Sequence, residues 1–377
     1  MTSASFIACR GHKQIKCIEV TVNTNVETVA CLFNLTNTGS GMQYGYGSPP
    51  LRKQTMQRFD HLREHRAVVM TSEFLDKRIF EVPMWIALNS SPLPDAQLLH
   101  ELPSWTYERA SPTNDIEDGK ERIRAYIETI NEFYRDADFA SFLEDYKSQY
   151  SEIVMQVRAN LPPDDFVATM ENYYGKEHAG YALIPSPGLF EFAGLGVAVV
   201  SEEGTTISNV FGASIIRSVK DAVEAGKRKF DPQRDYTFEN PERIRELTVH
   251  EFGHAFVNPV AEQYKDEINQ YSHLYNPIKE RMAELTYHDW WVCAVEHIVR
   301  AGEVRIAMAM GQEESAQRLL QKYVCNYHFV YLPEVVEGMA AYEHNRATYM
   351  TIDEFFPELL KVFEKIDASE ISDLNVR

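Results

Sequence analysis

Residues 250–254 read His-Glu-Phe-Gly-His, and this HExxH stretch decides how the rest of the chain is interpreted. Its surroundings are typical of a helix. Asn240 suits the N-cap, Pro241 suits the first helical position, and Asn258-Pro259 suits the end. We therefore expect the motif on a helix of about 17 residues.

The spacing within the motif suits a metal site. Four residues make just over one helical turn, so His250 and His254 project from one face and can bind a single tetrahedral ion such as Zn²⁺. Glu251 is rotated by about 100° from His250. That offset favours a general base for a water molecule over a third ligand. The alternative is a surface helix with two solvated histidines.

A third protein ligand is expected further along the chain. The extended HExxHxxGxxH pattern is absent, because Val257 and Val260 occupy its glycine and last histidine positions. Residues 290–301 predict a strongly apolar helix in which Glu296 is a carboxylate among apolar side chains. Such a group should be ion-paired or metal-bound, so Glu296 is the preferred ligand, and an ion pair with Arg300 is the alternative. The rival ligands are Glu284, His288 and His297.

A donor for the negative oxygen of a hydrolytic transition state is also expected. Tyr342, Arg346 and Tyr349 have the spacing i, i+4 and i+7 of one helical face. We single out Tyr342 and Arg346 as catalytic candidates. The alternative is ordinary packing of amphipathic tyrosines.

A second sequence motif could also be a zinc site. Residues 61–65 (His-Leu-Arg-Glu-His) match the inverted HxxEH zinc pattern. Their neighbours are highly charged, and no strand pair precedes them. A solvated helix is the favoured interpretation, with His65 able to reach a cleft from outside the core.

The wider pattern predicts an α+β fold with a small mixed sheet, an active-site helix and a mostly helical C-terminal half. Strands are expected at residues 181–185, 194–200 and 206–211, with a hairpin turn at 202–205. The 194–200 strand could pair with an extended substrate. We also expect a strand that turns into a helix at 17–34 and a helix at 53–66. Three prolines predict a loop at 83–96. Residues 116–159 predict two helices, which are broken near Asp136–Asp138 and ended by Pro162-Pro163.

We expect one domain at residues 18–368, with an N-terminal helical elaboration at 18–165 and a catalytic core at 166–368. Residues 1–17 are interpreted as a tail or signal remnant. Met1–Cys9 has no basic region and too short an apolar run for a complete export signal, so export would require a start further upstream.

The composition narrows the classes of partner. The net charge of −19 disfavours nucleic acid and anionic membrane surfaces. No apolar stretch is long enough to insert into a membrane. The five cysteines match no metal knuckle and are expected to be free thiols. The oligomeric state is not indicated.

The ordered set of motifs resembles the zincin metallopeptidases, in particular the gluzincin-like branch with two histidines from HExxH and a downstream glutamate. More narrowly, it is similar to a family of uncharacterised bacterial proteins, many from Bacteroidetes, with HEFxHxFVNP and ExxVRA motifs. The matching stretches are 250–259, 296–301 and 342–349, with weaker likeness at 18–34, 64–68 and 209–218.

The resemblance implies a zincin-like fold, His250, His254 and Glu296 as zinc ligands, and Glu251 as catalytic base. The first hypothesis is therefore a zinc-dependent peptidase acting on a peptide or protein substrate. The second is a zinc-dependent hydrolase of another bond, or a zinc protein without turnover. The third is a non-enzymatic interaction protein with a coincidental HExxH.

Overall fold

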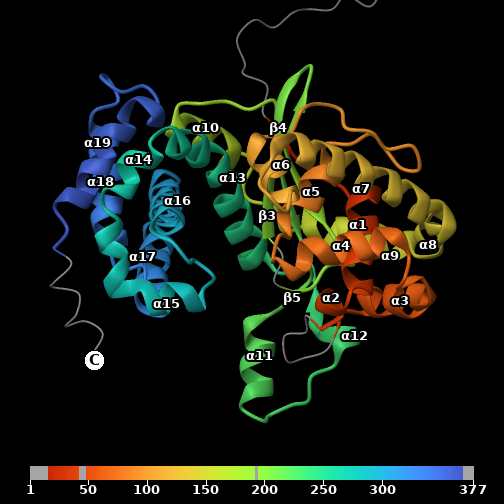
Figure 1. The fold of residues 1–377 in the computed structure, drawn as a ribbon. Helices are drawn as coiled ribbons and strands as arrows, with labels where there is room; N and C mark the ends of the chain where they lie inside the picture. Colours follow the sequence, from red (N-terminus) through yellow and green to blue (C-terminus); the bar gives the residue numbers. More distant parts are fainter. Residues whose placement is uncertain (1–15, 42–47, 192–193, 368–377) are drawn as a thin grey trace, which may run out of the picture.

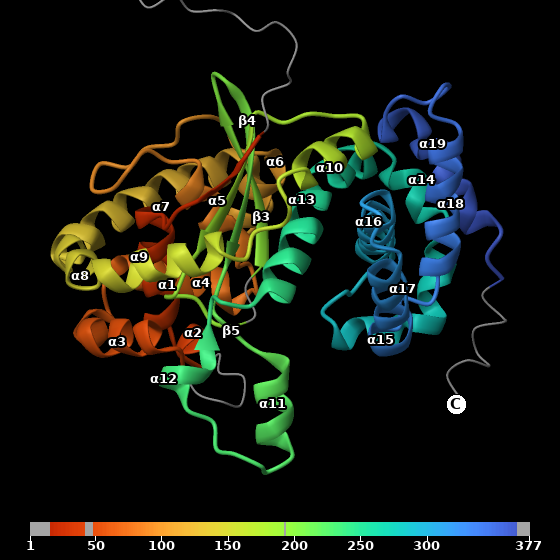
Figure 2. The same cartoon turned by 180° about the vertical axis from the view of Figure 1, so that it is seen from behind.

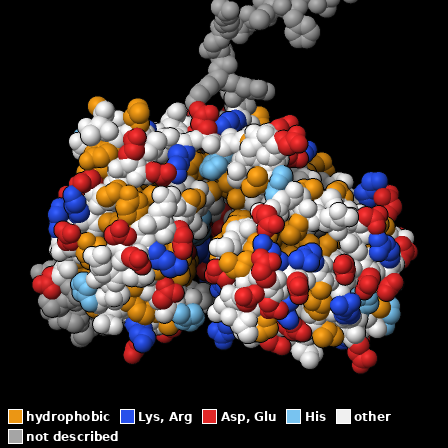
Figure 3. Space-filling view, turned by 45° about the horizontal axis from the view of Figure 1, so that its top comes forward, with side chains coloured by type: hydrophobic (Ala, Val, Ile, Leu, Met, Phe, Trp, Pro, Cys, Tyr) orange, Lys and Arg blue, Asp and Glu red, His pale blue; other side chains and the backbone are white. Residues whose placement is uncertain are grey.

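The computed structural model describes residues 16–41, 48–191 and 194–367. Most of the expected N-terminal tail, residues 1–17, lies outside the described residues. Figure 1 shows two halves: the early helices and the sheet on one side, and the C-terminal helices on the other. In the space-filling view a furrow separates these halves (Figure 3).

A small mixed sheet occupies the centre, in the strand order β1-β2-β4-β3. The strands β1 (Ile18–Val20), β2 (Gly180–Pro185) and β4 (Gly204–Phe211) run parallel to one another. The strand β3 (Gly194–Ser201) pairs antiparallel with β4. The predicted strands and their hairpin turn are confirmed, and β3 lies at an edge of the sheet.

The sheet separates two hydrophobic cores, because its side chains alternate between its faces. Val197 and Val210 face the core built with α1 (Thr24–Leu35), α5 (Glu81–Leu88) and α7 (Ile116–Asp136). Leu183, Ile207 and Phe211 face the core built around α13 (Pro241–Gln263). Both cartoon views place α13 between the sheet and α16 (Figures 1 and 2).

The expectation of a loop at 83–96 was wrong for its first part, because α5 reaches Leu88. Pro83 lies in the first turn of α5, where a missing N–H leaves no helical bond unmade. The segment 116–159 forms three helices rather than two. The break is confirmed at Asp138, whose φ is 46°. The remaining helices of this half are α2 (Asn37–Gly41), α3 (Pro50–Phe59), α4 (Arg66–Asp76), α6 (Ser104–Ala110), α8 (Phe139–Asp145), α9 (Lys147–Arg158) and α10 (Phe166–Tyr174).

The motif helix α13 is longer than expected and contains 23 residues. Asn240 caps it as predicted, its side chain accepting from the Arg243 N–H. Its expected end at Asn258-Pro259 was wrong. Val260 and Ala261 are buried beyond the proline, and this packing outweighs the one backbone bond that Pro259 cannot make.

The C-terminal half is mostly helical, as predicted. Its central helix α16 (Trp290–Ala309) packs against α13, α17 and α18. The expectation of one helical face across 341–350 was wrong, because α18 ends at His344. Glu354 accepts from the Met350 and Thr351 N–H groups and caps a new helix instead. The other elements are β5 (Ser214–Ile215), α11 (Arg217–Glu224), α12 (Pro232–Asp235), β6 (Tyr236–Thr237), α14 (Lys265–Asn269), α15 (Lys279–Glu284), α17 (Glu313–Gln321), α18 (Leu332–His344) and α19 (Ile352–Glu364), with short 3-10 turns at Asp60–Leu62 and Ser272–Ile278 and a π-helical turn at Lys322–Asn326.

Two expectations about composition can be compared with the described residues. Cys31, Cys293 and Cys325 are free thiols, as predicted. Within the described ranges, no helix combines the length and the apolar character that a membrane span requires.

Candidate metal centre

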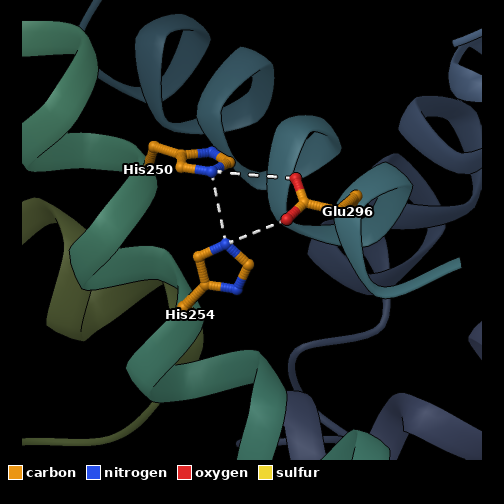
Figure 4. A group of neighbouring side chains, drawn as sticks. All are labelled: His250, His254 and Glu296. Atoms are coloured by element: carbon orange, nitrogen blue, oxygen red, sulfur yellow. Dashed lines mark hydrogen bonds and ion pairs between the residues drawn. The ribbon is translucent and has the colours of Figure 1, made fainter. Parts of the chain in front are cut away.

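The helices α13 and α16 approach closely at the HExxH motif. A Cβ atom added at Gly253 would lie 3.3 Å from Val299 Cγ1 and 3.5 Å from the Tyr174 hydroxyl. The glycine inside His-Glu-Phe-Gly-His therefore lets α16 pack against α13. This contact places Glu296 of α16 opposite His250 and His254 of α13 (Figure 4).

His250, His254 and Glu296 form a compact donor set whose ligand atoms all lie within 4.8 Å of one another. The two Nε2 atoms are 3.2 Å apart. The carboxylate oxygens of Glu296 lie 3.7 Å from His250 Nε2 and 3.5 Å from His254 Nε2. A tetrahedral zinc site with bonds of about 2.0–2.1 Å requires donor separations of about 3.3 Å, so these residues fit zinc.

The carboxylate of Glu296 lies in a buried and charged environment. Burial alone would raise its pKa, but the Arg300 guanidinium and the two histidines hold that pKa well below its usual value. Arg300 donates to Glu296, and its guanidinium carbon lies 4.3 Å from the Phe329 ring centroid and 5.1 Å from that of Tyr323. Glu296 is therefore ionised and held in place before any metal binds.

The imidazole of His254 is the basic member of the set. Burial would lower its pKa, but the hydrogen bond and negative charge of Glu296 outweigh burial and raise the pKa to about 9. Protonation of His254 therefore stabilises the folded, metal-free protein. This contribution to the stability is complete below about pH 6.5, the usual histidine pKa, and it is lost as the pH rises through 9.

This raised pKa gives a pH-dependent prediction. Zinc requires a neutral imidazole, so at pH 7.5 each zinc should displace about one proton from His254. The apparent zinc affinity should rise about tenfold per pH unit up to about pH 9 and then level off. Calorimetry in buffers of different ionisation enthalpy measures the number of protons released. Zinc binding without proton release would contradict the assignment of His254.

Glu303 is a functional candidate that the sequence did not indicate. Its Oε1 lies 2.8 Å from His250 Nδ1, and its Oε2 accepts from the Tyr323 hydroxyl at 2.6 Å. When the second ring nitrogen of a metal-binding histidine is hydrogen-bonded to a carboxylate, this bond fixes the tautomer and the orientation of the ring. Asn258 Oδ1 contacts His254 Nδ1 in the same way, at 3.0 Å. The only sequence signal is that Glu303 lies seven residues, about two turns, after Glu296.

Replacing Glu303 by glutamine should weaken zinc binding about 10- to 100-fold, because the amide supports the His250 imidazole less strongly than the carboxylate does. Competition with a chromophoric chelator measures this affinity. Glu343→Gln is the control, since Glu343 pairs with Arg305 and has no contact with the donor set in the described structure. An unchanged affinity for the Glu303 variant would remove this residue from the site.

The carboxylate of Glu251 lies against the edge strand β3 and interacts electrostatically with His254. Its Oε2 accepts from the Gly196 N–H at 2.8 Å. A Cβ at Gly196 would lie 3.0 Å from the Glu251 carbonyl oxygen, and one at Gly194 would lie 3.0 Å from Oε1. Glycines at both positions of β3 therefore make room for this carboxylate.

The catalytic candidates Tyr342 and Arg346 are not brought to the donor set by any contact among the described residues. Tyr342 is fully buried, and Arg346 donates to its hydroxyl. Arg346 also donates to the carbonyl oxygens of Asn172 and Tyr173, at 2.9 and 2.7 Å. These contacts tie α18 to the end of α10, which is a structural role.

Tyr287, which the sequence did not indicate, contacts the donor set. Its hydroxyl accepts from Arg300 Nη2 at 3.1 Å and is hydrogen-bonded to Glu296. Burial and the charge of Glu296 raise its pKa well above the usual value, so it stays protonated and can donate. No sequence pattern indicates this role, because the loop that carries Tyr287 is positioned by tertiary contacts.

The rival ligands lie elsewhere. Glu284 is exposed and pairs with Arg281. His288 is exposed on the surface. His297 is fully buried, with Nδ1 2.7 Å from the Cys293 carbonyl oxygen, and burial lowers its pKa to about 4. His65 of the inverted motif caps α4, accepting from the Ala67 N–H, and it joins no metal-ligand group among the described residues.

Comparison with known proteins gives a family and no activity. The model of a family described as "Domain of unknown function (DUF4932)" matches residues 48–362, which is more than half of the chain. The chain belongs to this family. No curated protein and no solved structure matches it. The description of DUF4932 assigns no chemistry, so the zincin resemblance is carried forward as a proposal.

Proposed function

We propose that this protein is a zinc-dependent metallopeptidase with a zincin-like core. The proposal is supported chiefly by the donor set of His250, His254 and Glu296, whose spacing suits one zinc ion, beside the carboxylate of Glu251. Residues of HExxH and a distant glutamate meet at one point, which the coincidental-motif hypothesis does not predict.

When bound, zinc supplies a Lewis acid that polarises the substrate carbonyl and lowers the pKa of water. The chain supplies the proton transfers. Glu251 is the general base: its carboxylate takes a proton from the attacking water and passes it to the leaving amine. Glu303 and Asn258 hold the two imidazoles in orientation through their Nδ1 atoms.

Tyr287 takes the role first assigned to Tyr342 and Arg346. Its protonated hydroxyl lies beside Glu296 and can donate to the oxygen that becomes negative in the transition state. Arg300, which donates to the same hydroxyl, orients it for this purpose.

Replacing Tyr287 by phenylalanine should lower kcat about 100-fold and leave KM and zinc content nearly unchanged, because the donor acts mainly in the transition state. Tyr342→Phe is the matched comparison and should change kcat little. If instead Tyr342→Phe lowers kcat and Tyr287→Phe does not, the sequence-based assignment is right and this one is wrong.

The remaining alternative of comparable weight is a zinc-dependent hydrolase of another bond, since the donor set does not define the scissile group. A peptide library and a panel of esters and amides, each incubated with the zinc-loaded protein, distinguish the two. Cleavage of peptides alone supports the peptidase. Turnover of esters without any peptide cleavage would replace it by the alternative.

A further inference from the structure

The outer edge of β3 carries backbone groups that no other strand in the described part of the chain pairs with. In an antiparallel ladder, every second residue directs its N–H and C=O away from its partner. The Gly196 N–H donates to Glu251, and the Ala198 carbonyl accepts from Asn89 Nδ2 at 3.3 Å. The outward backbone groups of β3 therefore belong to Gly194, Gly196 and Ala198. Because the Gly196 N–H is bonded to Glu251 and the Ala198 carbonyl to Asn89, an extended peptide could pair with the groups of Gly194 and the carbonyl of Gly196.

The position of Glu251 sets where cleavage would occur along this edge. Its carboxylate is 2.8 Å from the Gly196 N–H. A general base must reach the reacting atoms directly or through one water. The bond that is cut therefore lies opposite Gly196, near one end of β3.

The next outward residue along this edge, Ala198, already has a hydrogen-bond partner in Asn89. Asn89 follows α5 and is only 3% exposed. Its side chain donates to the Trp85 carbonyl at 3.0 Å as well as to Ala198. The helix α5 packs along β3 here. A peptide strand could thus pair at Gly194 and with the Gly196 carbonyl, but it would find the Ala198 acceptor occupied by a buried amide.

The strand direction decides which end of the substrate is limited. Antiparallel pairing is the more stable and more frequent arrangement. A peptide antiparallel to β3 runs with its N-terminal side toward Ala198 and its C-terminal side past Gly194. The structure leaves room for about two residues before the cleaved bond, given the two-residue repeat of the ladder.

We infer that the substrate is a peptide cut within about two residues of its free amino end, so that the enzyme acts as an exopeptidase from the N-terminus. This inference rests on the proposed function. It adds a substrate class that neither the HExxH motif nor the donor set defines, because it depends on Asn89 and α5 at the edge strand.

The test is to incubate the zinc-loaded protein with a peptide library with free termini and to locate every cleavage by mass spectrometry. Most cuts should fall at the first or second bond, and two added N-terminal residues should move them by two positions. Cuts spread through peptide interiors, or gathered at the C-terminal end, would overturn the inference but leave the peptidase intact. No cleavage of any peptide would overturn both.

A variant tests the role of Asn89. Asn89→Ala frees the Ala198 carbonyl and should raise the share of cuts beyond the second bond at least threefold. Ser91→Ala, which removes a hydroxyl in the same loop that accepts from the Gln97 N–H, is the control and should leave the cleavage positions unchanged. Zinc content of both variants reports on folding. An Asn89→Ala protein that binds zinc and keeps the wild-type cleavage pattern would contradict the closure at Ala198.

Discussion

Replacement of Glu251 by glutamine should lower kcat about 1000-fold while leaving zinc binding intact. The glutamine amide has nearly the same shape as the carboxylate. Its oxygen can still accept the hydrogen bond that the Gly196 N–H donates to Glu251 Oε2 at 2.8 Å. It cannot take a proton from water, so only the base is lost. Peptide hydrolysis and metal content, measured on the same preparation, give both parts of this result.

Glu262→Gln is the matched control on the same helix, because Glu262 is exposed and pairs only with Lys265 among the described residues. It should retain full activity. An active Glu251→Gln protein would mean that another group is the base. Loss of zinc from that variant would mean that Glu251 is a ligand rather than a base.

Replacement of Arg300 by methionine should destabilise the metal-free protein by about 3–5 kcal/mol. Arg300 lies between Glu296 and the aromatic rings of Tyr323 and Phe329, and its removal takes away the guanidinium that neutralises most of the charge of this buried carboxylate. Zinc supplies positive charge to the same carboxylate, so the loss should be much smaller in the zinc-loaded protein. Urea unfolding with and without zinc measures both values.

Arg318→Met makes the same chemical change at an exposed position, where the side chain is 69% exposed. It should change stability by less than about 0.5 kcal/mol in either state. If Arg300→Met costs equally much with and without zinc, the guanidinium is important for packing against the rings and not for the charge of Glu296.

The parts of this structure that local spacing controls could be predicted from the sequence. His250 and His254 share a face because of the helical period, and Glu296 stood out as a carboxylate in an apolar helix. The β2, β3 and β4 strands followed from apolar runs bounded by glycine and proline. In each case neighbours along the chain carry the information.

The parts that depend on tertiary contacts could not be predicted. Glu303 and Tyr287 belong to the site only because α16 and the loop before it pack beside α13 and the π-helical turn at Lys322–Asn326. The spacing of Tyr342 and Arg346 suggested one functional face, but α18 ends between them. Pro259 suggested a helix end, which the buried residues beyond it override.

Equilibrium zinc binding to the wild-type protein, to His254→Ala and to Glu296→Ala tests the central proposal most directly. One zinc per chain should bind the wild type, and both substitutions should weaken binding at least about 1000-fold, since each removes one of three protein donors. Glu284→Ala should bind zinc as the wild type does. No zinc in the wild type, or equal binding in all four proteins, would contradict the metal site and with it the proposed peptidase.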